Sequence, residues 1–98
     1  MDKYTSKIME NRNAYTVFYS PSCFYSEEAL RLLKNQRLPY KGYQINNISG
    51  GIEKLLYFLN ESKEKTAFDP KHRTRPLIFK DGKFIGGYTE LKASLEGP

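Results

Sequence analysis

The chain has 98 residues and a formal net charge of +5, and its 39% hydrophobic and 14% aromatic residues suffice for the core of one small domain. A single cysteine excludes an intramolecular disulfide, so we expect a cytoplasmic protein whose fold depends on packing. No stretch of about 18 apolar residues occurs, and residues 1–13 are polar, so we expect neither a membrane span nor export.

The N-terminal half predicts a strand, a helix and a second strand. Residues 1–13 are expected to be a polar extension before one domain at 14–98. Residues 15–19 are aromatic and β-branched, as in a buried strand. Apolar residues then recur at helical spacing as Tyr25, Ala29, Leu32 and Leu33. With a further strand at 40–45, this order predicts a βαβ unit with parallel strands.

The C-terminal half predicts a helix, a hairpin and a last helix. Apolar residues at helical spacing mark a helix over 52–59, and part of the long polar stretch 60–73 is expected to extend it. Asp81-Gly82 between two apolar runs predicts a type I′ hairpin turn. Thr89 is expected to cap the last helix. The predicted order is β-α-β-α-β-β-α.

Cys23 lies between the first strand and the start of the first helix. The unpaired N–H groups and the positive dipole end of a helix stabilise an anion, and the thiolate is the reactive form of cysteine. This position favours a nucleophile over a buried free cysteine that only fills space.

The pattern resembles the glutaredoxins, within the thioredoxin fold. Four landmarks occur in the family's order: Cys23-Phe24-Tyr25-Ser26, Arg73-Thr74-Arg75-Pro76, Asp81-Gly82 and Gly86-Gly87-Tyr88-Thr89-Glu90. The resemblance implies an α/β fold with a four-stranded mixed sheet flanked by helices. It also implies a glutathione-dependent thiol-disulfide oxidoreductase of redox homeostasis, with Cys23 as the nucleophile.

Three residues depart from the family's pattern. Ser26 replaces the usual second cysteine, Phe24 the usual proline, and Ser20 a common lysine. Without a resolving thiol Cys23 cannot close an intramolecular disulfide, so a monothiol cycle on glutathione mixed disulfides is expected. The sequence fits either a natural monothiol member or a cysteine-to-serine variant of a dithiol form. Ser20, together with Glu27 and Glu28, predicts weaker thiol activation than is usual in the family.

The resemblance also implies where glutathione binds. Pro76 of Thr74-Arg75-Pro76 is expected to be cis, and the residue before it pairs its backbone with the cysteinyl part of glutathione. Gly87 lets the backbone approach closely, and the N–H groups near Tyr88 and Thr89 receive the γ-glutamyl carboxylate. Arg73 or Lys71 is expected to contact the glycyl carboxylate, with Arg73 favoured because it precedes Thr74, and Arg75 is a further candidate for the same contact. Tyr25 either borders the thiol and the groove or begins the apolar helix face. The expected contacts are Tyr25, Arg73, Thr74, Arg75, Pro76, Gly87, Tyr88 and Thr89.

Two other function classes remain open from the sequence. In an iron-sulfur cluster carrier, one thiolate per subunit and glutathione would hold the cluster in a dimer. In a redox-inactive adaptor, the basic residues 71–75 would contact a protein or nucleic acid. We favour the oxidoreductase: a monomer with glutathione and glutathionylated or disulfide-containing proteins as partners, and with no metal, nucleic-acid or membrane site.

Overall fold

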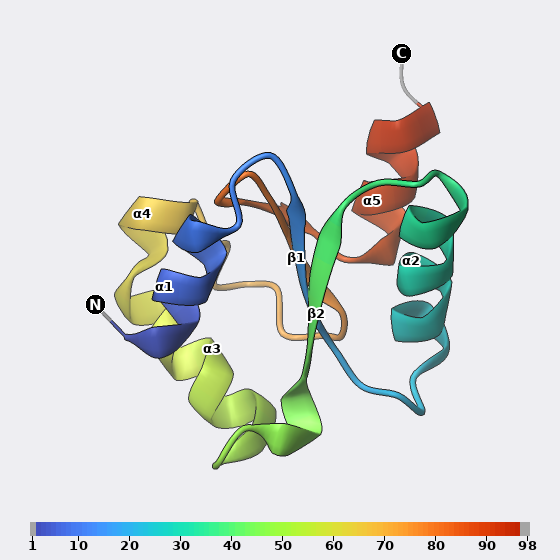
Figure 1. Cartoon of the computed structure of the whole chain (residues 1–98). Helices are drawn as coiled ribbons and strands as arrows, with labels where there is room; N and C mark the ends of the chain where they lie inside the picture. Colours follow the sequence, from blue (N-terminus) through green and yellow to red (C-terminus); the bar gives the residue numbers. More distant parts are fainter. Residues whose placement is uncertain (1, 97–98) are drawn as a thin grey trace.

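The computed structural model describes residues 2–96, so Met1 and the last two residues of the expected domain at 14–98 lie outside it. A four-stranded sheet in the order β2-β1-β3-β4 forms its centre (Figure 1). β1 (Tyr15–Tyr19) pairs in parallel with β2 (Tyr40–Gln44) and antiparallel with β3 (Leu77–Lys80), and β3 pairs antiparallel with β4 (Lys83–Gly86). This mixed sheet confirms the predicted thioredoxin-like fold.

Helices cover both faces of the sheet. α2 (Phe24–Asn35) and α5 (Tyr88–Glu96) lie together beside one face, to the right in Figure 1. The other side holds α1 (Lys3–Glu10), α3 (Gly51–Glu61) and α4 (Lys63–Thr66), and the short 3₁₀ helix η1 (Ile45–Asn47) leads from β2 toward α3. Within residues 2–96, none of these helices combines the length and apolarity needed to cross a bilayer.

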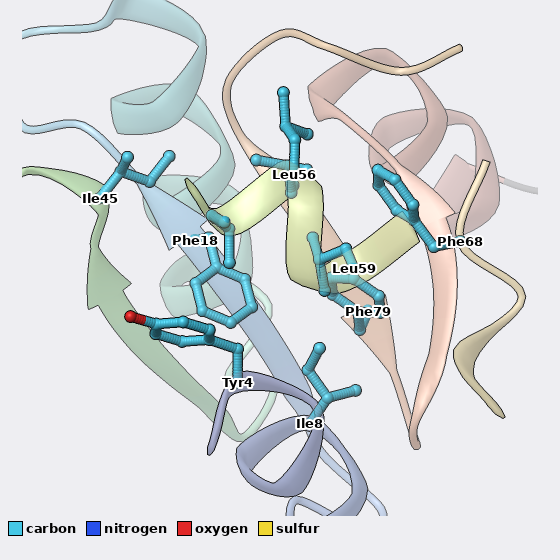
Figure 2. Packing of buried hydrophobic residues seen from close by; sticks show 10 residues of the cluster. Tyr4, Ile8, Phe18, Ile45, Leu56, Leu59, Phe68 and Phe79 are labelled. Atoms are coloured by element: carbon cyan, nitrogen blue, oxygen red, sulfur yellow. The ribbon is translucent and has the colours of Figure 1, made fainter. Parts of the chain in front are cut away.

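Two hydrophobic clusters occupy the two faces, because side chains alternate along a strand. Phe18 on β1 and Phe79 on β3 pack with α1 and α3, and their rings meet edge to face at 6.1 Å (Figure 2). Their neighbours Val17 and Ile78 point to the opposite face and pack with α2 and α5. The two central strands, β1 and β3, are therefore buried on both sides, with the α2 and α5 face carrying the smaller cluster.

Helix α1 is not foreseen in the sequence analysis, which describes residues 1–13 as a polar extension. Asp2 caps the helix by accepting the Thr5 N–H at 2.8 Å, and the Thr5 hydroxyl hydrogen-bonds the Ser62 hydroxyl at the junction of α3 and α4. Tyr4 and Ile8, one helical turn apart, are buried in the core (Figure 2). Burying such side chains contributes about 1.5–3 kcal/mol each. Two apolar residues are too few to produce a visible helical stripe in the sequence.

The hairpin between β3 and β4 is confirmed. Asp81 and Gly82 have φ values of 49° and 85°, the positive pair that a type I′ turn requires. Part of the stretch 60–73 is helical, as expected: α3 continues to Glu61 and α4 follows before an irregular segment. That segment leads to Pro76 at the start of β3, and the Arg75–Pro76 peptide bond is cis, as expected.

Candidate active site

Cys23 is the N-cap residue of α2. Its backbone is extended, with φ −98° and ψ 123°, its carbonyl accepts the Glu27 N–H at 3.0 Å, and its N–H donates to the Ser20 carbonyl at 3.1 Å. The side chain is half-buried and makes no capping hydrogen bond to the helix. A turn at the end of β1 therefore places the sulfur at the start of α2 while leaving it accessible to a reactant.

Opposing influences act on the thiol. Partial burial raises the pKa of Cys23, but interactions with the N–H and hydroxyl of Ser26 and with the N–H of Tyr25 lower it, and the positive charge of Arg75 lowers it further. The net result is a pKa below the ordinary value for cysteine. A larger share of Cys23 is therefore thiolate at neutral pH than in an unperturbed cysteine.

Ser26 does more than replace a second cysteine, because its hydroxyl interacts with both Ser20 and Cys23. Its side chain is fully buried, and its hydroxyl oxygen accepts the Ser20 N–H at 3.1 Å. The same hydroxyl stabilises the thiolate of Cys23. Sequence reasoning missed this contribution, although a serine three residues after an N-cap is well placed to reach it.

A groove of about 370 Å³ brings most of the expected glutathione contacts together. It is lined by Tyr25, His72, Thr74, Arg75, Gly87, Tyr88, Thr89 and Glu90. Pro76 is buried, and its carbonyl oxygen lies 3.3 Å from His72 Nε2. Cys23 is not among the lining residues, but it lies two residues before Tyr25, and the charge of Arg75, which lines the groove, lowers its pKa.

Arg73 is not brought into this groove. Its guanidinium lies 3.3 Å from the Glu53 carboxylate of α3, and both side chains are exposed. It lines a different pocket, between α3 and the segment before β3. Sequence position alone does not show on which side of a loop a long side chain points, so the expectation for Arg73 receives no geometric support, whereas Arg75 faces the groove.

The N-terminus of α5 differs from the expected arrangement. The helix begins at Tyr88, so Thr89 lies in its first turn and is not the cap. Instead Glu90 Oε1 accepts the Gly87 N–H at 2.7 Å, the return bond of a capping box. A Cβ on Gly87 would lie 3.3 Å from the Pro76 carbonyl oxygen, so close packing favours glycine there. The glutamate three residues after Gly87 is the sequence signal for this cap.

Tyr25 belongs to the groove and not to the apolar helix face. Its side chain is 55% exposed, whereas α2 buries Ser26, Ala29 and Leu33. Its ring centroid lies 6.1 Å from that of Tyr88 at the start of α5. The first of the two alternatives for Tyr25 is therefore favoured.

His72 is a groove residue that the expected glutathione contacts do not include. It is half-buried, lines the groove and packs its ring against Phe84 of β4, with centroids 5.2 Å apart. No sequence signal indicates this position, because the segment before β3 has no regular structure.

No protein-family model matches the chain. Two curated proteins that are named glutaredoxins are similar to it over most of its length. A probable glutaredoxin of Acanthamoeba polyphaga mimivirus is 42% identical over 101 residues, which cover 98% of this chain and 95% of that relative. Glutaredoxin-2 of Schizosaccharomyces pombe is 30% identical over 88 residues, covering 90% and 72% of the two chains.

Solved structures agree with these relatives. The solution structure of the dithiolic glutaredoxin 2-C-Grx1 from Trypanosoma brucei brucei superposes with a TM-score of 0.76 and 28% identity, covering 98% of this chain and 89% of that one. The crystal structure of a buckwheat glutaredoxin-glutathione complex has a TM-score of 0.63 and 21% identity, covers 92% and 80%, and shows a shared fold.

Proposed function

Since the chain belongs to the glutaredoxin family, we propose that it reduces glutathione mixed disulfides by a monothiol mechanism with Cys23 as the nucleophile. One observation carries the proposal. The only cysteine of the chain lies at a helix N-terminus with a lowered pKa, two residues before Tyr25 of a groove that gathers most of the expected glutathione contacts.

The cycle begins when the Cys23 thiolate attacks the glutathione sulfur of a glutathionylated substrate. A sulfur-sulfur bond forms between Cys23 and glutathione, and the bond between glutathione and the substrate breaks. The substrate leaves as a thiolate and takes a proton from solvent. A second glutathione thiolate then attacks the glutathione sulfur on Cys23, which releases oxidised glutathione and regenerates the Cys23 thiolate.

Because Ser26 stands where a second cysteine is usual, a second glutathione is needed to release Cys23 from its mixed disulfide. A thiol at this position would attack the Cys23 mixed disulfide from within the same chain, but a hydroxyl is far too weak an acid to supply that nucleophile. The buried Ser26 instead stabilises the Cys23 thiolate, which is both the attacking group of the first step and the leaving group of the second.

In this proposal the groove binds glutathione through its peptide backbone and its two carboxylates. The backbone of Thr74 and Arg75 pairs with the cysteinyl part of glutathione, above the buried Pro76. The N–H groups of Tyr88 and Thr89 face the γ-glutamyl carboxylate at the N-terminus of α5. The buckwheat protein is a complex with glutathione, and its shared fold supports the choice of this ligand.

Arg75 replaces Arg73 as the cation proposed for the glycyl carboxylate. Arg75 lines the groove and forms no ion pair among residues 2–96, whereas the Arg73 charge is already opposite Glu53. A cation that is free to contact a carboxylate forms the stronger charge-assisted hydrogen bond.

The test is an assay of the reduction of a glutathionylated peptide by glutathione, comparing the unaltered protein with Cys23→Ser and Ser26→Cys. We expect Cys23→Ser to fall to the rate without protein. Intact mass after one turnover without added glutathione should show one glutathionyl group on the unaltered protein. Ser26→Cys should gain activity on protein disulfides. Equal rates for the unaltered protein and Cys23→Ser would remove Cys23 as the nucleophile.

A further inference from the structure

Two exposed aromatic rings and one half-buried ring follow one another from the residue after Cys23 to the start of α5. Phe24, which directly follows Cys23, is 67% exposed, and its ring centroid lies 5.4 Å from that of Tyr25. The Tyr25 ring lies 6.1 Å from that of Tyr88. We call Phe24, Tyr25 and Tyr88 the aromatic ladder; it runs from the start of α2 to the start of α5.

The Phe24 side chain belongs to neither of the two hydrophobic clusters. α2 buries Ser26, Ala29 and Leu33 against the sheet, while Phe24 projects from the first helical position into solvent. It is the most exposed large hydrophobic residue among residues 2–96. A clustered exposed apolar surface commonly marks an interaction site in a soluble protein.

The position of the aromatic ladder limits what covers it. In the proposed reaction Cys23 attacks the glutathione sulfur, and the substrate sulfur is bonded to that sulfur at about 2.05 Å, so the substrate cysteine is held close to the site. Successive residues of an extended chain are separated by about 3.3–3.6 Å, so the neighbours of the reacting cysteine lie within reach of Phe24. The substrate protein is therefore the occupant that the chemistry itself brings to this surface.

Resting on the proposed function, we infer that the aromatic ladder is the docking surface for the substrate protein. It selects glutathionylated cysteines that have an apolar or aromatic residue beside them. Tyr25 and Tyr88 also line the groove, so Phe24 is the member of the ladder that faces substrate alone. Phe24 is therefore the specificity-determining residue.

The test compares two glutathionylated peptides of equal length and charge that differ only in the residue after the cysteine, phenylalanine or serine. The mixed disulfide of glutathione with free cysteine serves as a substrate without flanking residues. We expect kcat/KM to be about fivefold higher for the phenylalanine peptide, the size of one added aromatic contact. Phe24→Ala should remove this preference, and Phe24→Leu should restore part of it.

Tyr57→Ala is the matched control. Tyr57 is an exposed aromatic residue of α3, 57% exposed, and lines neither the groove nor the ladder, so its removal should leave the peptide preference unchanged. Equal kcat/KM for both peptides, with normal turnover of the cysteine-glutathione disulfide, would overturn the docking surface and leave the proposed function standing. No turnover of that small disulfide would overturn the proposed function itself. Concentration-dependent dimers that disappear in Phe24→Ala, without a peptide preference, would assign the ladder to self-association.

Discussion

Two helix N-termini border the candidate site, and the chain treats them differently. At α2 the N-cap is Cys23, whose side chain makes no capping hydrogen bond. The N–H groups of Tyr25 and Ser26 in the first turn lower the pKa of its thiol. At α5 the carboxylate of Glu90 accepts the Gly87 N–H at 2.7 Å. One terminus is open and the other is closed by a negative charge from the same helix.

The comparison shows how the same helix dipole serves two purposes. A helix N-terminus stabilises whichever anion lies nearest. At α2 that anion is the reactive thiolate, so the field contributes to chemistry. At α5 it is a side chain of the fold, so a ligand carboxylate must share the terminus with Glu90. We therefore expect the α2 terminus to favour the thiolate and Glu90 to weaken binding of the γ-glutamyl carboxylate.

The largest effect is expected at the open terminus, from Ser26→Ala. The change removes a hydroxyl that lowers the pKa of Cys23, so the rate of Cys23 alkylation by iodoacetamide at mildly acidic pH should fall about fivefold. The Ser20 N–H also loses its acceptor, so the free energy of unfolding should fall by about 1–3 kcal/mol. The matched control is Ser22→Ala, a change at the exposed residue on the other side of Cys23. An unchanged pH profile of alkylation in folded Ser26→Ala would contradict the role of the hydroxyl.

Glu90→Gln tests the closed terminus with a smaller effect. Glutamine keeps an acceptor for the Gly87 N–H but removes the charge, so KM for glutathione should fall about threefold, the range of one charge at a helix end. Glu90→Ala removes charge and cap together, so it should share the lower KM and lose about 1 kcal/mol of stability. Glu61→Gln, at the far end of α3, is the charge control. A higher KM in Glu90→Gln would show that the carboxylate assists binding.

Arg75→Gln tests the cation between the two termini. Its charge lowers the pKa of Cys23, as the least of the causes, so alkylation by the uncharged reagent iodoacetamide should slow only about twofold. The effect should shrink further in high salt, since salt screens exposed charges. Arg73→Gln is the matched control because that arginine faces Glu53. Equal slowing in both variants would indicate a general effect of net charge.

The smallest effect concerns stability against pH. Because the folded-state pKa of Cys23 is depressed, the thiolate contributes stability that is fully present above the pKa of the unfolded chain and is lost as pH falls through the folded-state pKa. The difference in free energy of unfolding between the unaltered protein and Cys23→Ala should therefore increase with pH across that window. Urea titrations at a series of pH values would measure it, and a difference that decreases with rising pH would contradict the depressed pKa.

The sequence predicts those parts of the molecule whose cause is local. Asp81-Gly82 specifies its own turn, and the strand before Cys23 and the helix after it follow from residue periodicity. Side-chain direction is decided by distant residues, so Arg73 was expected in the groove although it faces Glu53 on α3. Helix α1 depends on a core that other elements create, so its two buried apolar residues, Tyr4 and Ile8, carry no visible pattern of their own.

Two further features of the site, the cap of α5 and the position of His72, were not predicted from the sequence. The spacing of Gly87 and Glu90 is that of a capping box. Gly87 is also an expected glutathione contact, and that interpretation does not predict its hydrogen bond to Glu90. His72 had no local signal, since its place against Phe84 arises from the return of β4 beside the segment before β3.

The two clusters of the core differ in how closely they support the candidate site. Both helix N-termini of the site belong to the face of α2 and α5, so substitutions in that cluster move the reacting groups directly. The cluster around Phe18 and Phe79 lies behind the sheet with α1 and α3 (Figure 2). Substitutions there reach the start of α2 only through the sheet, but they reach the groove through Phe84, which packs on that cluster and against the ring of His72.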